Sequence, residues 1–457
     1  MIDAYREFLA SKALRAKPQG LSRIPPLADH LFDYQAACVE FGLAAGSSGL
    51  YLSTGLGKTA CELEWCRHAA DASNGRALIL TPLAVARQIE TEGRRWGYDC
   101  RVIREQADVR DGINICNYDR LDRLDVAAFG AVAADEAGIL KNFTGKTTRA
   151  MIEAFARHPW RLAATATPAP NDHMELGQQA EFLGVLAANE MLSRWFINDT
   201  STASQNWRLK GHAETDFWDW MASWSRMAEM PDDLGFDGSN FVLPPLKVTR
   251  HAVDGRVKPQ AGTLFAADVS ASSIFDVKRQ TSAARADMIA ALVLAEPGEP
   301  WLVWCDTDNE ADALIERLPG ATEVRGSHPI ERKEDALAAF VSGEARILIT
   351  KPSVAGWGMN FQHCARMAFV GRTFSYEAWF QAVRRCWRFG QTRPVEVHLA
   401  VAQGDDQIGR VIDRKATDHL KMIAAMRRAM RRGTATETSR MVAYEANHIG
   451  RLPQWLR

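Results

Sequence analysis

Leu52-Ser53-Thr54-Gly55-Leu56-Gly57-Lys58-Thr59 is the stretch around which the rest of the chain is organised. An apolar run from Gly49 to Leu52 predicts a strand before it, and a helix-forming run follows from Ala60 to Ala70. Glycines let backbone N–H groups close around phosphate oxygens, and the N-terminus of the following helix favours negative charge. Lys58 is placed to reach nucleotide phosphates, and the Thr59 hydroxyl to hold Mg²⁺. We therefore predict a nucleotide site here; the alternative is a chance glycine turn before a helix.

The composition is that of a globular protein with more than one domain. The chain has 457 residues, of which 47% are hydrophobic and 24% charged. No apolar run approaches the roughly 20 residues that span a bilayer, and the first residues lack the pattern of a signal peptide. The eight cysteines form no Cys-x-x-Cys pair, so neither a disulfide framework nor a zinc site is indicated, and Cys61 and Cys66 are expected to pack around their helix. These features favour a cytoplasmic protein with no membrane partner.

The charge is unevenly distributed along the chain. The net charge is −1, but the segment from Arg366 to Arg457 holds 17 Lys and Arg residues against 8 Asp and Glu residues. A basic C-terminal quarter indicates a surface for a polyanion, with a solvated arginine-rich helix as the alternative.

Strands and helices alternate after the phosphate loop, which predicts a parallel sheet with right-handed crossovers. A helix is expected to begin at Pro82 and run to about Trp96. The expected strands after the loop are buried or partly buried runs: Arg76–Leu80, Arg101–Ile103, Ile113–Asn117, Ala131–Ala134 and Arg161–Ala164. Some twenty residues ahead of the loop, the side-chain amide of Gln35 is able to pair with adenine.

An acidic pair follows one of these strands, 77 residues after Lys58. Ligands of open α/β sheets bind at the carboxyl ends of the strands, where this pair lies. Asp135 is expected to hold Mg²⁺, and Glu136 to orient and deprotonate the attacking water. The hydroxyls of Thr165 and Thr167, at the end of the next strand, are placed to sense the state of a triphosphate; an ordinary threonine turn is the alternative.

The alternation breaks over residues 186–245, which are rich in tryptophan and predict a helical insertion ending in a linker. We expect the tryptophans to form a small core rather than a base-stacking platform. Residues 251–279 are irregular. A second alternating pattern then starts, with helices over Thr281–Ala295, Asn309–Leu318 and Ile330–Val341 and strands at Trp301–Trp304, Glu323–Arg325, Arg346–Thr350 and Met367–Val370.

Two features of the second half of the sequence indicate that it binds phosphate groups. The glycines Gly356 and Gly358 permit a tight backbone path near phosphates of ATP or DNA. A helix is predicted from Tyr376 onward, and Arg385 and Arg388, three residues apart, would project from one of its faces as a fork for phosphate oxygens. A further helix, about Asp405 to Arg432, is expected to pack its apolar stripe on the second domain and to direct its terminal arginines to DNA; the last residues, around Leu452–Leu456, are a possible docking peptide.

This order of motifs resembles the superfamily-two helicases and translocases, over about Leu31 to Val401. Within them it most resembles the SWI/SNF-type ATPases, including stand-alone bacterial and phage members. The resemblance is carried by Gly55-Leu56-Gly57-Lys58-Thr59, by Ile139-Leu140-Lys141-Asn142 after the acidic pair, and by the segment Gln381 to Gln391. It implies an α/β fold of two RecA-like parallel-sheet lobes, with ATP and Mg²⁺ bound between them and double-stranded DNA as the partner.

The resemblance also implies roles for individual residues. Arg385 and Arg388 correspond to arginine fingers that act on the γ-phosphate, and Asn360 to a residue that couples ATP to DNA. The nucleotide is implied to contact Gln35, Gly55, Gly57, Lys58, Thr59, Gly356, Gly358 and Gln381, with Thr59 and Asp135 as metal ligands. The nucleic acid is implied to contact Thr81, Lys141, Asn142 and Asn360. Three positions depart from the family pattern: Leu52 and Thr54 in the phosphate loop, and Gly138, where the family usually has a histidine that links the ATP site to the second lobe.

We therefore predict a DNA-dependent ATPase that translocates along duplex DNA. The predicted domains are a lead (1–30), lobe one (31–185), a helical insertion in lobe one (186–245), lobe two (246–402) and a basic helical C-terminal extension (403–457). The alternatives are a helicase that separates DNA or RNA strands, a nucleic-acid-binding scaffold with a decayed ATPase, and the motor subunit of a nuclease or modification system whose other activity comes from a protein partner.

Overall fold

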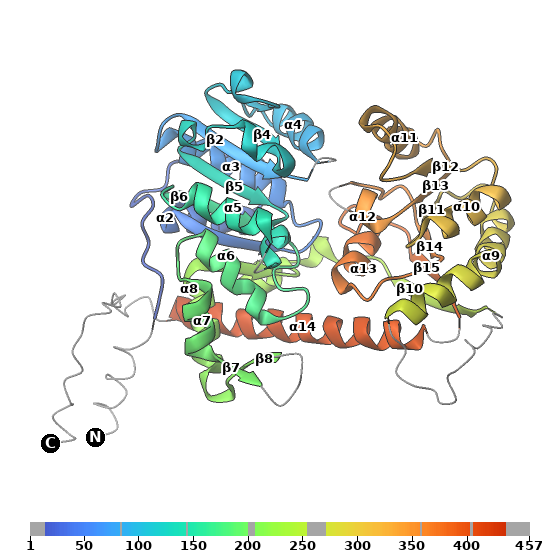
Figure 1. Cartoon of the computed structure of the whole chain (residues 1–457). Coiled ribbons are helices and arrows are strands. Elements are labelled where there is room, and N and C mark those ends of the chain that lie inside the picture. The colour runs from blue at the N-terminus through green and yellow to red at the C-terminus, as the bar shows by residue number, and fades with distance from the viewer. Residues whose placement is uncertain are drawn as a thin grey trace. The chain divides into compact units, whose positions relative to one another are not determined.

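The computed structural model describes residues 14–82, 85–142, 145–199, 206–253, 271–356, 359–402 and 405–435. These residues form two compact units (Figure 1). Lobe one comprises the chain up to Gly238 together with the residues from His419 onward, and lobe two runs from Ser239 to Asp418. Each lobe is built on its own parallel sheet, which confirms the predicted α/β fold of two RecA-like lobes.

The sheet of lobe one has seven strands in the order β3-β4-β2-β5-β6-β1-β9, all parallel. Their bounds are β1 Ser47–Leu52, β2 Arg76–Thr81, β3 Cys100–Val102, β4 Gly112–Asn117, β5 Ala131–Asp135, β6 Trp160–Ala164 and β9 Ser225–Ala228. The first six agree with the predicted strands to within one or two residues. Because parallel strands end at the same edge, the residues that follow β1, β5 and β6 are brought close together.

Helices cover both faces of this sheet, as a parallel sheet of buried Ala, Leu, Ile and Val residues requires. Side chains of α2 (Asp33–Ala45) and α3 (Lys58–Asp71) meet Leu50 and Leu162 on one face. Side chains of α5 (Lys146–Phe155) and α6 (Leu176–Phe182) share a core with Tyr51 and Ala163 on the other face. The thiols of Cys61 and Cys66 are fully buried, so their predicted packing role is confirmed.

The predicted helix after Thr81 begins later than the sequence indicated. The helix α4 covers Ala86–Arg95, with Val85 at its N-cap. Pro82 lies ahead of it and accepts a hydrogen bond from the Val85 N–H at 3.0 Å. Proline favours the first turn of a helix but does not force one to begin.

Residues 186–245 contain strands as well as the predicted helices. The helices α7 (Ala188–Trp195) and α8 (Glu214–Trp224) are present, together with an antiparallel hairpin of β7 (Phe196–Asp199) and β8 (Asn206–Leu209). The strand β9, which the sequence analysis missed, joins the lobe-one sheet beside β1. The tryptophans form core, as predicted: the buried members are Trp195, Trp218, Trp220 and Trp224, all within the main core of lobe one.

The sheet of lobe two has six parallel strands in the order β10-β15-β14-β11-β13-β12. Their bounds are β10 Leu246–Ala252, β11 Trp301–Trp304, β12 Thr322–Val324, β13 Ile347–Thr350, β14 Arg366–Phe369 and β15 Val395–Val401. One face packs on α9 (Ala271–Ala295) and α10 (Asp308–Arg317). The other packs on α11 (Ile330–Ser342), α12 (Pro352–Ala355) and α13 (Tyr376–Val383).

Two predictions for lobe two are corrected by the structure. Residues 251–279 are not irregular throughout, because β10 ends at Ala252 and α9 already begins at Ala271. The helix α13 ends at Val383, so Arg385 and Arg388 lie in turns beyond it rather than on one helical face. The backbone carbonyl of Arg385 accepts the N–H of Phe361 at 2.9 Å, and this tertiary hydrogen bond replaces the one that a continuing helix would need.

The long C-terminal helix α14 (Asp406–Ala435) packs mainly on a different lobe from the one expected. Its first turns belong to lobe two, where Ile408 and Ile412 pack with Tyr376. From His419 onward it belongs to lobe one, and Ile423 and Met426 enter the main core of that lobe. Neither α14 nor any other described helix is long and apolar enough to cross a membrane.

The carboxylate of Glu64 ties three segments of lobe one together. It lies on α3, is fully buried, and accepts hydrogen bonds from the Ala28 N–H and the Tyr98 hydroxyl, both at 2.8 Å, and from Arg67. Burial alone would raise its pKa, but hydrogen bonds from His68, Arg67, Tyr98 and Ala28 outweigh burial and lower the pKa to about 2.

Replacing Glu64 with glutamine is therefore expected to lower the free energy of unfolding by about 3 kcal/mol at pH 7. Because the pKa of Glu64 is lower in the folded protein, its stabilisation is complete above the ordinary pKa of 4.5 and is lost as the pH falls toward 2. Urea unfolding of both proteins between pH 7 and pH 3 measures this, with the exposed Glu40→Gln on α2 as the control. A stability difference that does not change with pH would contradict this account.

Candidate nucleotide site

The phosphate loop connects β1 directly to α3. Its glycines Gly55 and Gly57 have φ of 95° and 74°, the left-handed region that favours glycine. A Cβ atom at Gly57 would come within 2.2 Å of the Gln35 side-chain nitrogen, so a larger residue there would displace Gln35 as well as strain the backbone. The helix α3 begins at Lys58, whose ammonium lies 3.4 Å from the carbonyl oxygen of Leu52 at the start of the loop. The loop and the helix N-terminus thus have the form of a phosphate cradle.

Gln35 lies against this loop but is already paired. Its amide nitrogen donates to the carbonyl oxygen of Leu56 at 3.0 Å, and its amide oxygen accepts the N–H of Phe32 at 3.0 Å. The side chain is buried and holds the backbone of the loop. The predicted contact with adenine would require these bonds to be exchanged.

The acidic pair lies at the carboxyl end of β5, beside the loop. The carboxylate of Asp135 accepts the hydroxyl of Thr81 at 2.7 Å, and its backbone carbonyl accepts the hydroxyl of Tyr118 at 2.6 Å. Burial and the charge of Glu136 raise the pKa of Asp135 to about 6, while the nearby Lys58 opposes that shift. The positive charge near Asp135 is therefore too small to offset burial and the charge of Glu136. A bound cation would stabilise the ionised carboxylate of Asp135.

Glu136 is held in an unusual backbone conformation. It has φ of 54°, and it alone among the described residues other than glycine has a positive φ. Such a conformation costs about 1–3 kcal/mol and is found mainly at functional sites. The hydroxyl of Thr165, at the end of β6, lies 3.4 Å from the Glu136 carboxylate. Thr165 therefore lies beside the acidic pair, and the role of its hydroxyl in sensing a triphosphate stays a prediction.

Glu62 is a further acidic residue at this site, and the sequence analysis missed it. It lies one turn after Thr59 on α3 and is fully buried. Burial and the neighbouring charge of Asp135 raise its pKa well above the usual value, which favours the neutral form. Glu62 lies three residues after Thr59, and this spacing predicts that the two side chains share one helical face. The spacing alone does not distinguish Glu62 from an ordinary helical glutamate.

The residues present fit ATP with Mg²⁺. Among the described residues, no group of three or more His, Cys, Asp or Glu side chains forms a metal cage by itself. Mg²⁺ bound with a nucleotide needs only one or two protein ligands beside the phosphates, and the Thr59 hydroxyl and the Asp135 carboxylate would supply that donor set. Beside the neutral Glu62, the two acidic residues Asp135 and Glu136 accompany one lysine here, and a divalent cation would offset the remaining negative charge.

In lobe two, Arg385 and Arg388 converge on one backbone carbonyl, that of Met359, at 3.0 and 3.4 Å. Arg385 is buried and also donates to the side-chain and backbone oxygens of Gln381. Arg388 is half-buried. Gln381 is itself buried and contacts Arg385. Its contact with the nucleotide stays a prediction.

The glycine-rich segment of lobe two is described only in part. A Cβ atom at Gly356 would lie 2.1 Å from the carbonyl oxygen of Pro352, so the tight turn there requires glycine. Asn360 is half-buried, and its side-chain oxygen accepts the N–H of Gln362 at 3.2 Å. The predicted cofactor residue Gly358 lies outside the described residues.

The predicted nucleic-acid contacts differ in accessibility. Lys141 is half-buried and Asn142 is exposed, both at the end of the short 3₁₀ helix that follows the acidic pair. Thr81 is fully buried and bonded to Asp135, so the structure places it in the nucleotide site rather than on a surface that nucleic acid can reach.

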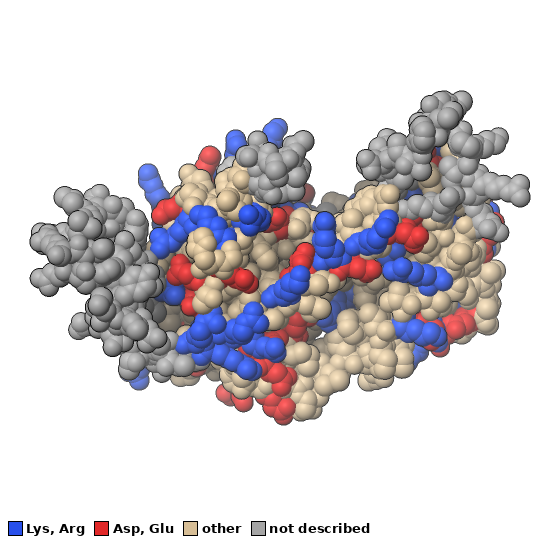
Figure 2. All heavy atoms as spheres, turned by 90° about the horizontal axis from the view of Figure 1, so that it is seen from below, with Lys and Arg blue, Asp and Glu red and all other residues tan. Residues whose placement is uncertain are grey.

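The charges on the C-terminal helix do not form a purely basic surface. Two of the arginines predicted to meet DNA are paired with lobe-one carboxylates, Arg427 with Asp233 at 3.1 Å and Arg432 with Asp219. Figure 2, which views the molecule from below, shows Lys and Arg side chains interspersed with Asp and Glu on that face. The excess of basic residues in the C-terminal sequence therefore overstates how basic the surface of this helix is in the folded chain.

Comparison with known proteins gives a family match in lobe two. Residues 284–390 match the family described as the helicase conserved C-terminal domain. The resemblance to helicases is confirmed. The matched segment covers most of lobe two, from α9 through the turns that carry Arg385 and Arg388. The chain is also similar to the SWI2/SNF2 ATPase core of Sulfolobus solfataricus solved with double-stranded DNA, with a TM-score of 0.41 and 16% identity over 92% of this chain and 98% of that chain.

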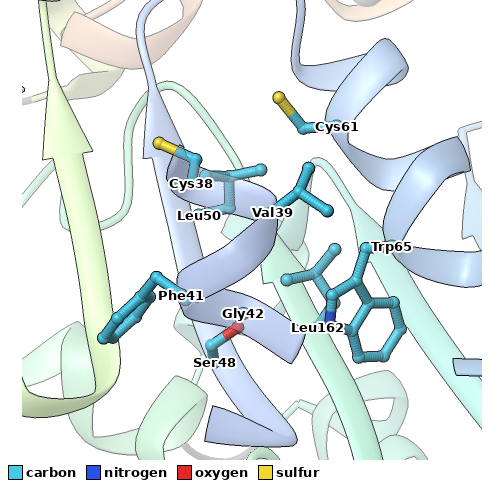
Figure 3. A pocket seen from close by; sticks show the side chains of 10 residues that line it. Cys38, Val39, Phe41, Gly42, Ser48, Leu50, Cys61, Trp65 and Leu162 are labelled. Atoms are coloured by element: carbon cyan, nitrogen blue, oxygen red, sulfur yellow. The ribbon is translucent and has the colours of Figure 1, made fainter. Parts of the chain in front are cut away.

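A pocket in lobe one is lined by no residue between Ser53 and Thr59 of the phosphate loop (Figure 3). It is enclosed by α2, α3 and strands β1 and β6, and the thiols of Cys38 and Cys61 lie on its wall. Burial raises the pKa of Cys38 to about 12, so this thiol is unreactive at neutral pH. The lining is mostly apolar, and it consists of Cys38, Val39, Phe41, Gly42, Ser48, Gly49, Leu50, Cys61, Trp65 and Leu162. Such a lining does not suit a nucleotide phosphate.

Proposed function

We propose that this chain is an ATP-dependent nucleic-acid motor of the SWI/SNF type, and that it translocates along double-stranded DNA. The observation that carries the proposal is the meeting of the phosphate loop, Asp135, Glu136 and Thr165 at one edge of the lobe-one sheet. The helicase-type sequence of lobe two supports it, because two such lobes are the minimum unit of a helicase-like motor.

Each residue of the site then has a defined task. Lys58 and the loop N–H groups hold the β- and γ-phosphates, and Thr59 and Asp135 bind Mg²⁺, which offsets negative charge on the phosphates. Glu136 orients the attacking water and accepts its proton. Lobe two contributes Arg388 to the γ-phosphate, with Arg385 and Gln381 fixing the turn that carries it.

A strand-separating helicase acting on DNA or RNA is the second candidate, since the same site would drive it. A motor subunit that works with a protein partner bearing nuclease or modification activity would also use this site. The presence of Lys58, Asp135 and Glu136 in the sequence argues against a scaffold with a decayed ATPase.

We expect duplex DNA to stimulate ATP hydrolysis more strongly than single-stranded DNA or RNA does. Steady-state hydrolysis by the full chain, alone and with each nucleic acid, measures this, with duplexes of unrelated sequence as a check on sequence independence. Because the contacts are expected to be with backbone phosphates, stimulation should weaken as salt is raised. Stimulation mainly by single strands or RNA would favour the helicase, and no hydrolysis with any of them would contradict the proposal.

A further inference from the structure

Ser53, within the phosphate loop, is fixed by the edge strand beside it. Its backbone N–H donates to the carbonyl oxygen of Ala228 at 2.8 Å, which continues the pairing of β1 with β9. Its hydroxyl donates to one carboxylate oxygen of Glu229 at 3.0 Å. The start of the loop is therefore held by residues that lie 175 positions or more away in the chain.

The second oxygen of Glu229 binds the C-terminal helix. The imidazole Nε2 of His419 lies 3.0 Å from it, and the His419 side chain is buried. One carboxylate thus joins the phosphate loop to α14 through two hydrogen bonds, all within lobe one. This network uses no residue of the acidic pair.

The position of His419 depends on the docking of α14. His419, Met422, Met426 and Met430 are separated by three or four residues and so lie along one face of the helix. The three methionines are buried in the core of lobe one. His419 can therefore reach Glu229 only when this face of α14 is packed against the lobe.

A second carboxylate holds the same helix independently of the loop. Asp233 accepts the backbone N–H groups of Glu229 and Met230 at 2.9 and 3.1 Å, and its other oxygen accepts Arg427 at 3.1 Å. Arg432 likewise binds Asp219 on α8. Both contacts help to dock α14, but Asp233 also binds the backbone of Glu229, so only the Arg432 contact provides a matched control.

We propose that Glu229 and His419 are positioning residues that couple nucleotide binding in the phosphate loop to the docking of the C-terminal half of α14. The inference rests on the proposed function, because it takes the loop to be the nucleotide site. When α14 is docked, His419 fixes the Glu229 carboxylate, and the carboxylate in turn fixes Ser53 in the conformation that receives phosphate. By linkage, a bound nucleotide must stabilise the docked helix by the same factor.

The test measures both directions of this coupling on the full chain. Affinity for a fluorescent, non-hydrolysable ATP analogue is compared between the wild type and His419→Ala, Ser53→Ala and Glu229→Gln. Each of the three variants is expected to bind about fivefold or more weakly, the lower end of typical coupling. Hydrogen exchange at the amides of residues 419–435 is then followed with and without the analogue. The analogue should slow exchange in the wild type and have no effect on it in Ser53→Ala.

Two controls separate coupling from a general loss of structure. Arg432→Ala removes a contact of α14 that does not involve Glu229, so it should bind the analogue within about twofold of the wild type. In the double variant Ser53→Ala with His419→Ala, affinity should fall no further than in His419→Ala alone, because both act through one carboxylate. A merely structural role for His419 would instead lower the melting temperature and give additive losses of affinity.

The outcomes distinguish this inference from the proposed function. If the wild type fails to bind the analogue, the nucleotide site itself is wrong, and the inference falls with it. If the wild type binds, and both Ser53→Ala and His419→Ala keep its affinity and its exchange response, the inference alone is overturned.

Discussion

Hydrolysis of ATP is expected to fall by about 10²–10⁴-fold in a Glu136→Gln variant that still binds the nucleotide. Glutamine has nearly the shape of glutamate, so it retains the packing at the end of β5 and the proximity to Thr165. It cannot accept a proton from water at neutral pH, so the general-base contribution is lost. Single-turnover hydrolysis and binding of a fluorescent nucleotide measure the two effects separately.

The Lys58→Ala variant provides the contrast. Lysine contacts the phosphates themselves, so its loss should weaken nucleotide binding as well as abolish hydrolysis. The exposed Glu153→Gln on α5 controls for the loss of a carboxylate from the lobe and should hydrolyse ATP at the wild-type rate. Wild-type turnover by Glu136→Gln would remove Glu136 from the catalytic role, whatever the result for Lys58.

The residues of this site were predictable because each has a local signature. Lys58 and Thr59 follow a glycine turn at the start of a helix, and Asp135 and Glu136 end an apolar strand. In a parallel sheet such strand ends lie at one edge, so local patterns are enough to bring the residues together in space.

Glu229 and Glu62 were not predictable on the same basis. Glu229 follows β9, a strand of four residues at the edge of the sheet whose serine and arginine give it no clear apolar pattern. Its partner Ser53 lies 176 positions earlier, and no periodicity records such a pairing. Glu62 looks like an ordinary helical glutamate until the fold buries it beside Asp135.

The C-terminal helix shows a second limit on what the sequence can predict. The spacing of Ile408, Ile423 and Met426 correctly predicted a helix with one apolar face. Periodicity identifies the face that is buried but not the surface that receives it, and the helix changes lobes near His419. In the same way, the spacing of Arg385 and Arg388 indicated a helix, whereas a tertiary hydrogen bond to the Arg385 carbonyl ends it earlier.

The second large effect on ATP hydrolysis is expected from a substitution of Arg388. Replacing it with alanine should lower the maximal rate of ATP hydrolysis by about 10³-fold while ATP binding is largely kept. The guanidinium is half-buried, and its contact with the carbonyl oxygen of Met359 is long, at 3.4 Å. It should therefore behave like the Glu136→Gln variant rather than like Lys58→Ala. Arg388→Lys keeps the charge but loses the planar fork, so it should recover only part of the rate.

Arg385 provides the sharpest comparison, because it lies three residues away and differs in burial. Its guanidinium is buried and satisfies the carbonyl of Met359 and two oxygens of Gln381. Alanine would take the Arg385 donor from both oxygens of Gln381, while the Met359 carbonyl would keep only its long contact with Arg388. Each buried acceptor left unpaired costs about 1–3 kcal/mol, so Arg385→Ala should lower the melting temperature of lobe two as well as the rate. Arg388→Ala should lower the rate alone. If it hydrolysed ATP normally in a folded protein, lobe two would not supply the arginine, and the proposed two-lobe site would be wrong.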